Sequence, residues 1–198
     1  MILTKHEVEE TSVAGQPDKA SAIIDLMSGH FKNVYGGSYE EGITRRTVVN
    51  VPTGSTFRAN KLFGGAYGRI DVTSTVKTDP ETGEPLKDEE GNDVVVVEET
   101  PRIDVACDVY EANVNYNSAD ATIDEAIYGG NNACRRTLYG KVNITAPVKG
   151  GSHWTGLVNV YGAGYGVNTW SQYTEVNLES GAEVQEVYGG GEKDRKSV

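Results

Sequence analysis

The sequence has few of the large apolar side chains that fill a thick globular core. Its 198 residues include three phenylalanines and two methionines, hydrophobic residues make up 37%, and the mean hydropathy is −0.44. No apolar run approaches the roughly 18 residues of a membrane-spanning helix. The composition therefore predicts a thin core and no transmembrane segment.

Positive charge is scarce as well. Lysine and arginine total 18 against 29 acidic residues, which gives a net charge of −11, and no basic stripe is present. Binding to nucleic acids or anionic membranes depends on neutralising phosphates, so we expect neither partner. The acidity is concentrated between Asp79 and Asp93, where seven acidic residues face only Lys87, a net charge of −6.

The residues that usually build catalytic or metal centres are sparse and scattered. His6, His30 and His153 lie far apart and at different phases of the repeat described below, so they predict neither a metal cluster nor a general base. The acidic run from Asp88 to Asp93 lacks the alternating spacing of a calcium loop and is expected to be a solvated hairpin tip. We predict no catalytic residue, no metal ion and no cofactor.

Glycine is abundant, with 24 residues, and it recurs in an internal repeat. The motif is an apolar residue, an aromatic ring and glycine, and its five copies begin at Val34, Leu62, Ile127, Val160 and Val187. An apolar-polar-apolar triplet, typical of a short strand, also occurs five times, at 24–26, 49–51, 114–116, 142–144 and 176–178. The step from motif to triplet is nearly constant (49 − 34 = 15, 142 − 127 = 15, 176 − 160 = 16), which indicates one unit stacked on copies of itself.

The period and residue types predict an all-β fold. A unit of about 28 residues with two or three short strands suits one coil of a right-handed parallel β-solenoid of about four to five coils. Glycine-rich segments cannot supply helical repeats. A β-sandwich and a propeller-like repeat are the alternatives, although a propeller blade usually needs about 40 residues.

The repeat also predicts which side chains are buried and where the chain turns. Three triplets are followed by the same glycine corner, at Gly29, Gly54 and Gly181. The predicted core consists of the outer triplet residues together with Phe31, Val34, Phe57, Leu62, Leu157, Val160, Val184 and Val187.

One interval is far longer than the others. Leu62 and Val114 are 52 residues apart where about 15 are expected, and the extra segment is rich in β-branched residues around a turn-rich stretch. We interpret it as a β-hairpin at about 69–105, inserted into a repeat domain at 21–191. Residues 1–20 are expected to form a polar tail or cap, and 192–198 a charged tail. The polar start has no signal-like apolar core, which indicates either a cytoplasmic protein or part of a longer precursor, and we expect the latter.

The segment 176–191, Val-Asn-Leu-Glu-Ser-Gly-Ala-Glu-Val-Gln-Glu-Val-Tyr-Gly-Gly-Gly, resembles the glycine-rich repeats of large adhesin-like surface proteins of gut Bacteroidetes, which are thought to form β-helices. The likeness covers about 22–191 apart from the insert. It implies a cell-surface or secreted location and a binding or structural role, with no catalytic residues to carry over. The pairs Arg45-Arg46 and Arg135-Arg136 and the acidic hairpin depart from the generic pattern.

The aromatic rings of the motif are the candidate recognition residues. If the coils stack, the rings form a ladder that either seals a glycine-thinned corner or packs against sugar rings. A row of asparagines from the triplets would offer amide hydrogen bonds on the same or another face. The ladder consists of Tyr35, Phe63, Tyr128, Tyr161 and Tyr188, and a second candidate patch consists of Trp154 and Trp170.

The two cysteines occupy nearly the same phase of successive coils. Cys107 lies seven residues before Val114, and Cys134 lies eight before Val142. They are therefore expected to be neighbours, as a disulfide or as two buried thiols.

Taken together, these features favour a non-enzymatic, adhesin-like or structural module at the cell surface or secreted. Its expected partner is a host glycan, a host protein or another copy, the last through the solenoid ends. The alternatives are a carbohydrate-active β-helix enzyme acting on polysaccharide and a structural subunit of a phage or other assembly.

Overall fold

The computed structural model describes residues 21–101, 107–133, 135–150, 154–166 and 169–192. This part of the chain is all-β and contains no helix, so none of its elements is a helix able to cross a membrane. The strands are β1 (Ser21–Asp25), β2 (His30–Tyr35), β3 (Tyr39–Glu40), β4 (Thr44–Val51), β5 (Arg58–Phe63), β6 (Tyr67–Gly68), β7 (Ile70–Val76), β8 (Val95–Pro101), β9 (Val109–Tyr116), β10 (Thr122–Tyr128), β11 (Arg136–Ile144), β12 (Asn159–Tyr161), β13 (Trp170–Leu178) and β14 (Val187–Tyr188).

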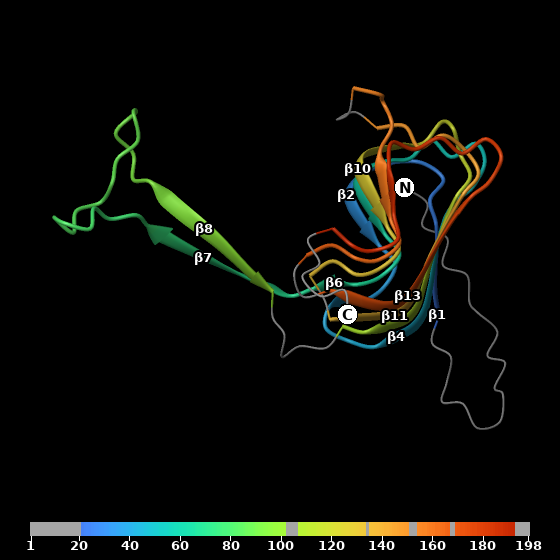
Figure 1. The fold of residues 1–198 in the computed structure, drawn as a ribbon, viewed down its shortest axis with the longest axis horizontal. Coiled ribbons are helices and arrows are strands. Elements are labelled where there is room, and N and C mark those ends of the chain that lie inside the picture. The colour runs from blue at the N-terminus through green and yellow to red at the C-terminus, as the bar shows by residue number, and fades with distance from the viewer. Residues whose placement is uncertain (1–20, 102–106, 134, 151–153, 167–168, 193–198) are drawn as a thin grey trace.

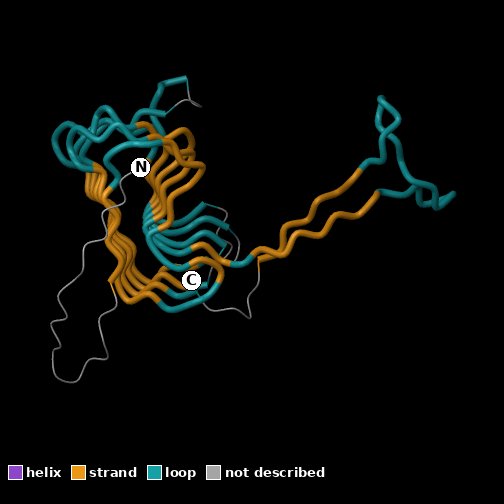
Figure 2. The backbone as a smooth tube through the Cα atoms, turned by 180° about the vertical axis from the view of Figure 1, so that it is seen from behind, coloured by secondary structure: helices purple, strands orange, loops and turns teal. Residues whose placement is uncertain are grey.

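Ten of the strands form two parallel five-stranded sheets, which we call sheet A and sheet B (Figures 1 and 2). Sheet A has the order β1-β4-β9-β11-β13 and sheet B the order β14-β12-β10-β5-β2, so each repeat contributes one strand to each sheet. The triplets align in register across sheet A, and the aromatic motifs align across sheet B. These parallel sheets are compatible with the predicted β-solenoid.

The main core lies between the two sheets. Alternation along each strand directs Val49, Val114 and Val142 of sheet A inward, and Leu62 and Ile127 of sheet B pack in the same cluster. All five side chains are fully buried, and each contributes about 1.5–3 kcal/mol by leaving water. Repetition therefore produces a continuous apolar interior along the stack.

Three residues predicted to be in the core lie elsewhere. Val158, rather than Leu157, is fully buried, because Val158 lies two residues before Val160 and shares its face of the extended chain at the start of β12. Leu178 is 46% exposed and Val187 is 42% exposed, because β13 and β14 are edge strands of the described sheets. For these three positions the core prediction was wrong.

The glycines have two separate structural roles. Gly29, Gly54 and Gly181 have φ values of 116°, 79° and 99°, which only glycine adopts readily, and they form the repeated corner. Gly129 instead lies against the next repeat, where an added Cβ would be 2.3 Å from the carbonyl oxygen of Gly162. The motif glycine is therefore required by close stacking of the backbones.

The inserted segment leaves the sheets as a projecting arm (Figures 1 and 2). Its strands β7 and β8 pair antiparallel from Ile70↔Pro101 to Val76↔Val95, and residues 77–94 form the tip. The end of the predicted insert, 102–105, lies outside the described residues. A further small parallel sheet joins β3 to β6 next to the base of this arm.

Candidate functional site

The five motif rings form one continuous stack along sheet B. Successive ring centroids are 4.6 to 5.0 Å apart, and successive ring planes differ by 9° to 15°. Phe63 is fully buried and Tyr128 is 1% exposed, whereas Tyr188 at the edge is 41% exposed. The faces of the central rings therefore contact neighbouring rings, and open ring surface is found mainly at Tyr188.

The hydroxyl of Tyr128 is also engaged inside this layer. It donates a hydrogen bond to the Glu192 carboxylate. Burial, together with this carboxylate, raises the pKa of Tyr128 far above its usual value. The phenol therefore remains a neutral donor, as expected for a structural tyrosine.

The outer face of sheet A carries polar side chains, because they alternate with the buried valines. We call this surface the polar face, and its residues are Asp25, Asn50, Pro52, Glu111, Asn113, Asn115, Asn117, Tyr139, Lys141, Asn143, Thr145, Tyr173, Glu175, Asn177 and Glu179.

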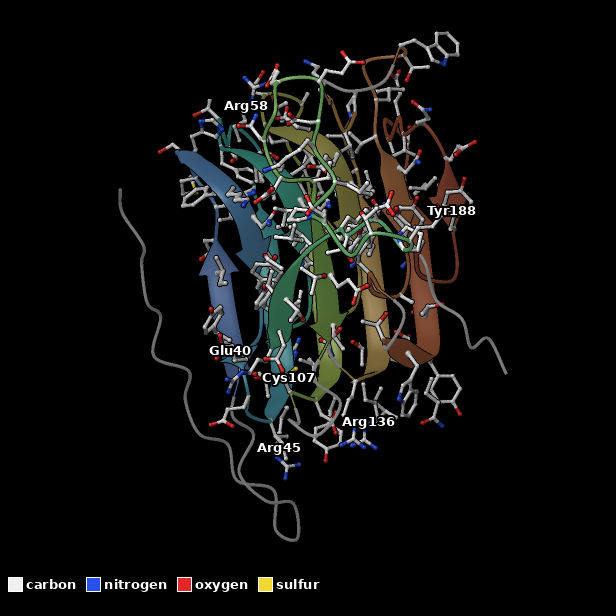
Figure 3. All side chains as sticks on the ribbon, turned by 90° about the vertical axis from the view of Figure 1, so that its left-hand side faces the viewer. Glu40, Arg45, Arg58, Cys107, Arg136 and Tyr188 are labelled. Carbon is white, nitrogen blue, oxygen red and sulfur yellow. The ribbon has the colours of Figure 1, made fainter. Side chains whose placement is uncertain are left out.

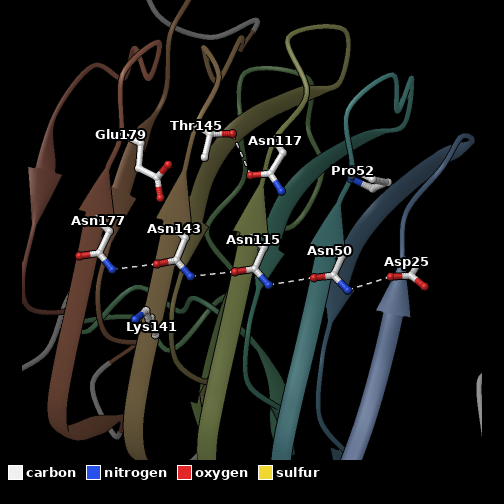
Figure 4. Close-up of a pocket in the computed structure, with 10 residues that line it drawn as sticks. All are labelled: Asp25, Asn50, Pro52, Asn115, Asn117, Lys141, Asn143, Thr145, Asn177 and Glu179. Carbon is white, nitrogen blue, oxygen red and sulfur yellow. Dashed lines mark hydrogen bonds between the residues drawn. The ribbon is translucent and has the colours of Figure 1, made fainter. Parts of the chain in front are cut away.

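An asparagine row, formed by Asn50, Asn115, Asn143 and Asn177, crosses the centre of the polar face (Figure 4). The Nδ2 of each asparagine donates to the Oδ1 on the preceding strand, with distances of 2.8 Å or 2.9 Å, and the row ends at the Asp25 carboxylate. Parallel strands lie about 4.8 Å apart, a spacing that lets identical amides bond in this way. The row, which the sequence pattern predicted, holds its side chains in one orientation.

Glu175 is the centre of a second polar cluster on this face. It lies 2.9 Å from Lys141 Nζ and accepts hydrogen bonds from the Tyr139 hydroxyl and from Asn177 Nδ2. These hydrogen bonds, that from Tyr139 first, lower the pKa of Glu175 to about 2. The carboxylate is therefore ionised and fixed in orientation at neutral pH.

An open hollow of about 650 Å³ lies over the asparagine row (Figure 4). Amides, Lys141 and the carboxylates of Asp25 and Glu179 line it, so it offers both donors and acceptors. Such a surface is suited to a hydroxyl-rich ligand, which needs many partners of both kinds.

Three exposed aromatic side chains could contact a ligand, and one of them lies on the polar face. Tyr173 is 59% exposed and stands two residues before Glu175 on the same face of β13. Trp170, at the start of β13, is 42% exposed, and Trp154 is 93% exposed in a loop. Tyr173 is not part of the repeat motifs and was not predicted as a site residue, although its position four residues before Asn177 places it on the outer face of the strand.

A cluster of arginines and aromatic rings occupies one end of sheet A. The guanidinium of Arg45 is 5.7 Å from the ring centroid of Tyr110, and that of Arg136 is 5.3 Å from Tyr110 and 5.9 Å from Trp170. Figure 3 shows Arg45 and Arg136 at the same end of the molecule. We call Arg45, Arg46, Tyr110, Arg135, Arg136 and Trp170 the arginine corner.

The structure describes one of the two cysteines. Cys107 is buried, whereas Cys134 lies outside the described residues, so the disulfide stays a prediction. Mass analysis without reduction tests it, and two free thiols would contradict the pairing.

The histidines do not gather in the described residues. His30 lies on β2, and His6 and His153 are outside the described residues. Within the described ranges, no group of three His, Cys, Asp or Glu residues is arranged to hold a metal.

Comparison with known proteins identifies no similar protein. No protein-family model, curated protein or solved structure matches the chain.

Proposed function

We propose that the protein is a non-enzymatic β-solenoid module, secreted or displayed on a cell surface, that binds a glycan along the polar face of sheet A. The observation that carries this proposal is the ordered asparagine row with the exposed Tyr173 on the same face. Sugars present both hydroxyl groups and an apolar ring face, and this surface offers a partner for each.

The solenoid part of the proposal rests on the order of the strands. The chain alternates between sheets A and B at each repeat, and all pairings within these two sheets are parallel. A right-handed path is the usual result when a twisted strand is followed by a crossover to a parallel strand. Each repeat is then one coil, and the hairpin interrupts a single coil.

The rigidity of the polar face favours binding of an extended chain. The amides are held by one another, and Glu175 is held by three donors, so little side-chain entropy is lost when a ligand binds. The regular strand spacing also repeats the same donors and acceptors along the sheet, as an extended polysaccharide repeats its hydroxyl groups.

A glycan array followed by titration tests the proposal. We expect at least one saccharide to bind, and Tyr173→Ala to weaken that binding about tenfold through the loss of ring stacking. Tyr39→Ala is the matched control, because Tyr39 is also an exposed tyrosine but lies on the separate small sheet. Absence of binding to any saccharide, or an equal loss in both variants, would contradict the proposal.

A further inference from the structure

The arginine corner is an island of positive charge on an acidic chain. It contains four arginines, whereas the net charge of the whole chain is −11. Arg136 lies 3.1 Å from Asp108 and Arg46 lies 3.6 Å from Glu111. Arg45 and Arg135 form no ion pair with any acidic side chain of the described residues, so the corner keeps a net positive charge.

The geometry of the corner suits carboxylate ligands. The guanidinium groups of Arg45 and Arg136 both lie within cation–π distance of the Tyr110 ring, a contact that favours their position beside it. A guanidinium held in this way can present two parallel N–H donors to one carboxylate. Stacking of the repeats does not require these residues, because they do not recur in each repeat.

The complementary surface is the tip of the hairpin. Of its seven acidic residues, Asp79 and Asp88 accept backbone hydrogen bonds that shape the turns, and Asp93 pairs with Lys87. The other four are exposed glutamates without an ion pair among the described residues: Glu81, Glu84, Glu89 and Glu90. The tip is therefore an ordered loop that presents four free carboxylates.

The hairpin cannot bring this tip to its own corner. Seven-residue strands of about 3.4 Å per residue extend the ribbon by about 24 Å, and the paired strands prevent it from folding back. Figures 1 and 2 show the arm directed away from sheets A and B. The tip is therefore available only to another molecule.

The arm itself also lacks a cover. Val72, Val76, Val95 and Val97 lie on one face of the ribbon and are between 44% and 60% exposed. A lone two-stranded hairpin is marginally stable in water and gains stability when its apolar face is covered. A partner that binds the tip would also lie against this face.

We propose that the acidic tip of one molecule docks onto the arginine corner of a second copy, with the valine face of the arm against that copy. The two surfaces differ, so the contact is heterologous and leaves one free tip and one free corner at the ends. Association then continues head to tail into rings or open chains. Its strength falls with salt, because charge complementarity supplies both steering and specificity.

Sedimentation velocity on the full chain tests this proposal with two complementary variants. The corner variant carries Arg45→Glu and Arg135→Glu, and the tip variant carries Glu→Gln at Glu81, Glu84, Glu89 and Glu90. We expect the unmodified chain to associate at low salt and to dissociate at about 0.5 M sodium chloride. Each variant alone is expected to be monomeric, and their equimolar mixture to form dimers and nothing larger.

The mixture is decisive because the corner variant has an intact tip and the tip variant has an intact corner. Only this one pair of surfaces can dock, so association stops at the dimer. The control variant, Lys32→Glu with Lys149→Glu, has the same change in net charge as the corner variant at exposed sites elsewhere, and should associate like the unmodified chain. Circular dichroism verifies that all variants are folded. The proposal would be overturned if the mixture remained monomeric. It would also be overturned if the unmodified chain were monomeric and its arginine corner bound polygalacturonate, a polymer rich in carboxylates, instead of a second copy.

Discussion

The stacked sheets and the projecting hairpin are stabilised in different ways. In the sheets, each repeat covers its neighbour with the same residue types, so valines, asparagines and rings form continuous rows. In the hairpin, two strands have only each other, and four valines remain exposed. The comparison shows that residues repeated in every unit are explained by stacking, whereas the exposed groups of the insert are not explained by its own fold.

The largest expected effect on stability is the difference between replacing a motif glycine in the middle of the stack and replacing the equivalent glycine at its edge. Gly129→Ala places a Cβ 2.3 Å from a backbone oxygen, so we expect a loss of about 3 kcal/mol in the free energy of unfolding. Gly189, the same motif position in the last repeat, has no atom within 4 Å of such a Cβ. Urea denaturation of Gly189→Ala should therefore give a nearly unchanged midpoint, and equal losses would show that stacking does not select this glycine.

A second pair of variants compares the two regions directly. Val114 is fully buried between the sheets, whereas Val97 of the hairpin is 58% exposed. We expect Val114→Ala to cost about 2 kcal/mol through lost burial and a residual cavity, and Val97→Ala less than about 0.5 kcal/mol. The measurement is again urea denaturation, at a protein concentration low enough to keep the chain monomeric. A larger loss for Val97→Ala would indicate that the arm packs within its own molecule.

The regular part of this architecture was predictable from sequence because its period is short and constant. The triplets identified the aligned strands of sheet A, since alternation in a strand leaves only two choices of face. Leu157 was placed in the wrong phase because it lies within the long connection from Ile144 to Val160, where the alternation of the preceding strand does not continue. The contact of Tyr110 with Arg136 was also missed, because these residues come from different strands and occupy no repeated position.

Acid titration tests the polar face of the sheets. The pKa of Glu175 is lowered to about 2 from an unfolded value of 4.5, so its contribution is complete above pH 4.5 and is lost as the pH falls toward 2. Because this side chain is exposed to solvent, we expect a small effect. Glu175→Gln should reduce the pH dependence of the unfolding midpoint in this window. An unchanged pH dependence in the variant would show that the Tyr139 and Lys141 contacts contribute nothing to stability.

The smallest effect on global stability is expected in the hairpin. The Asp88 carboxylate accepts hydrogen bonds from the backbone amides of Asn92 and Glu90, that of Asn92 being the larger cause of its lowered pKa, and these bonds shape the tip. Asp88→Ala should leave the unfolding midpoint of the sheets unchanged, because the tip lies at the far end of the arm, away from sheets A and B (Figure 1). Exchange of the Glu90 and Asn92 amides with deuterium should nevertheless become faster, while that of the Val114 amide stays slow. If exchange slowed or stayed the same at the tip, the carboxylate would not be what orders it, and the ordered presentation of the four free glutamates would need another cause.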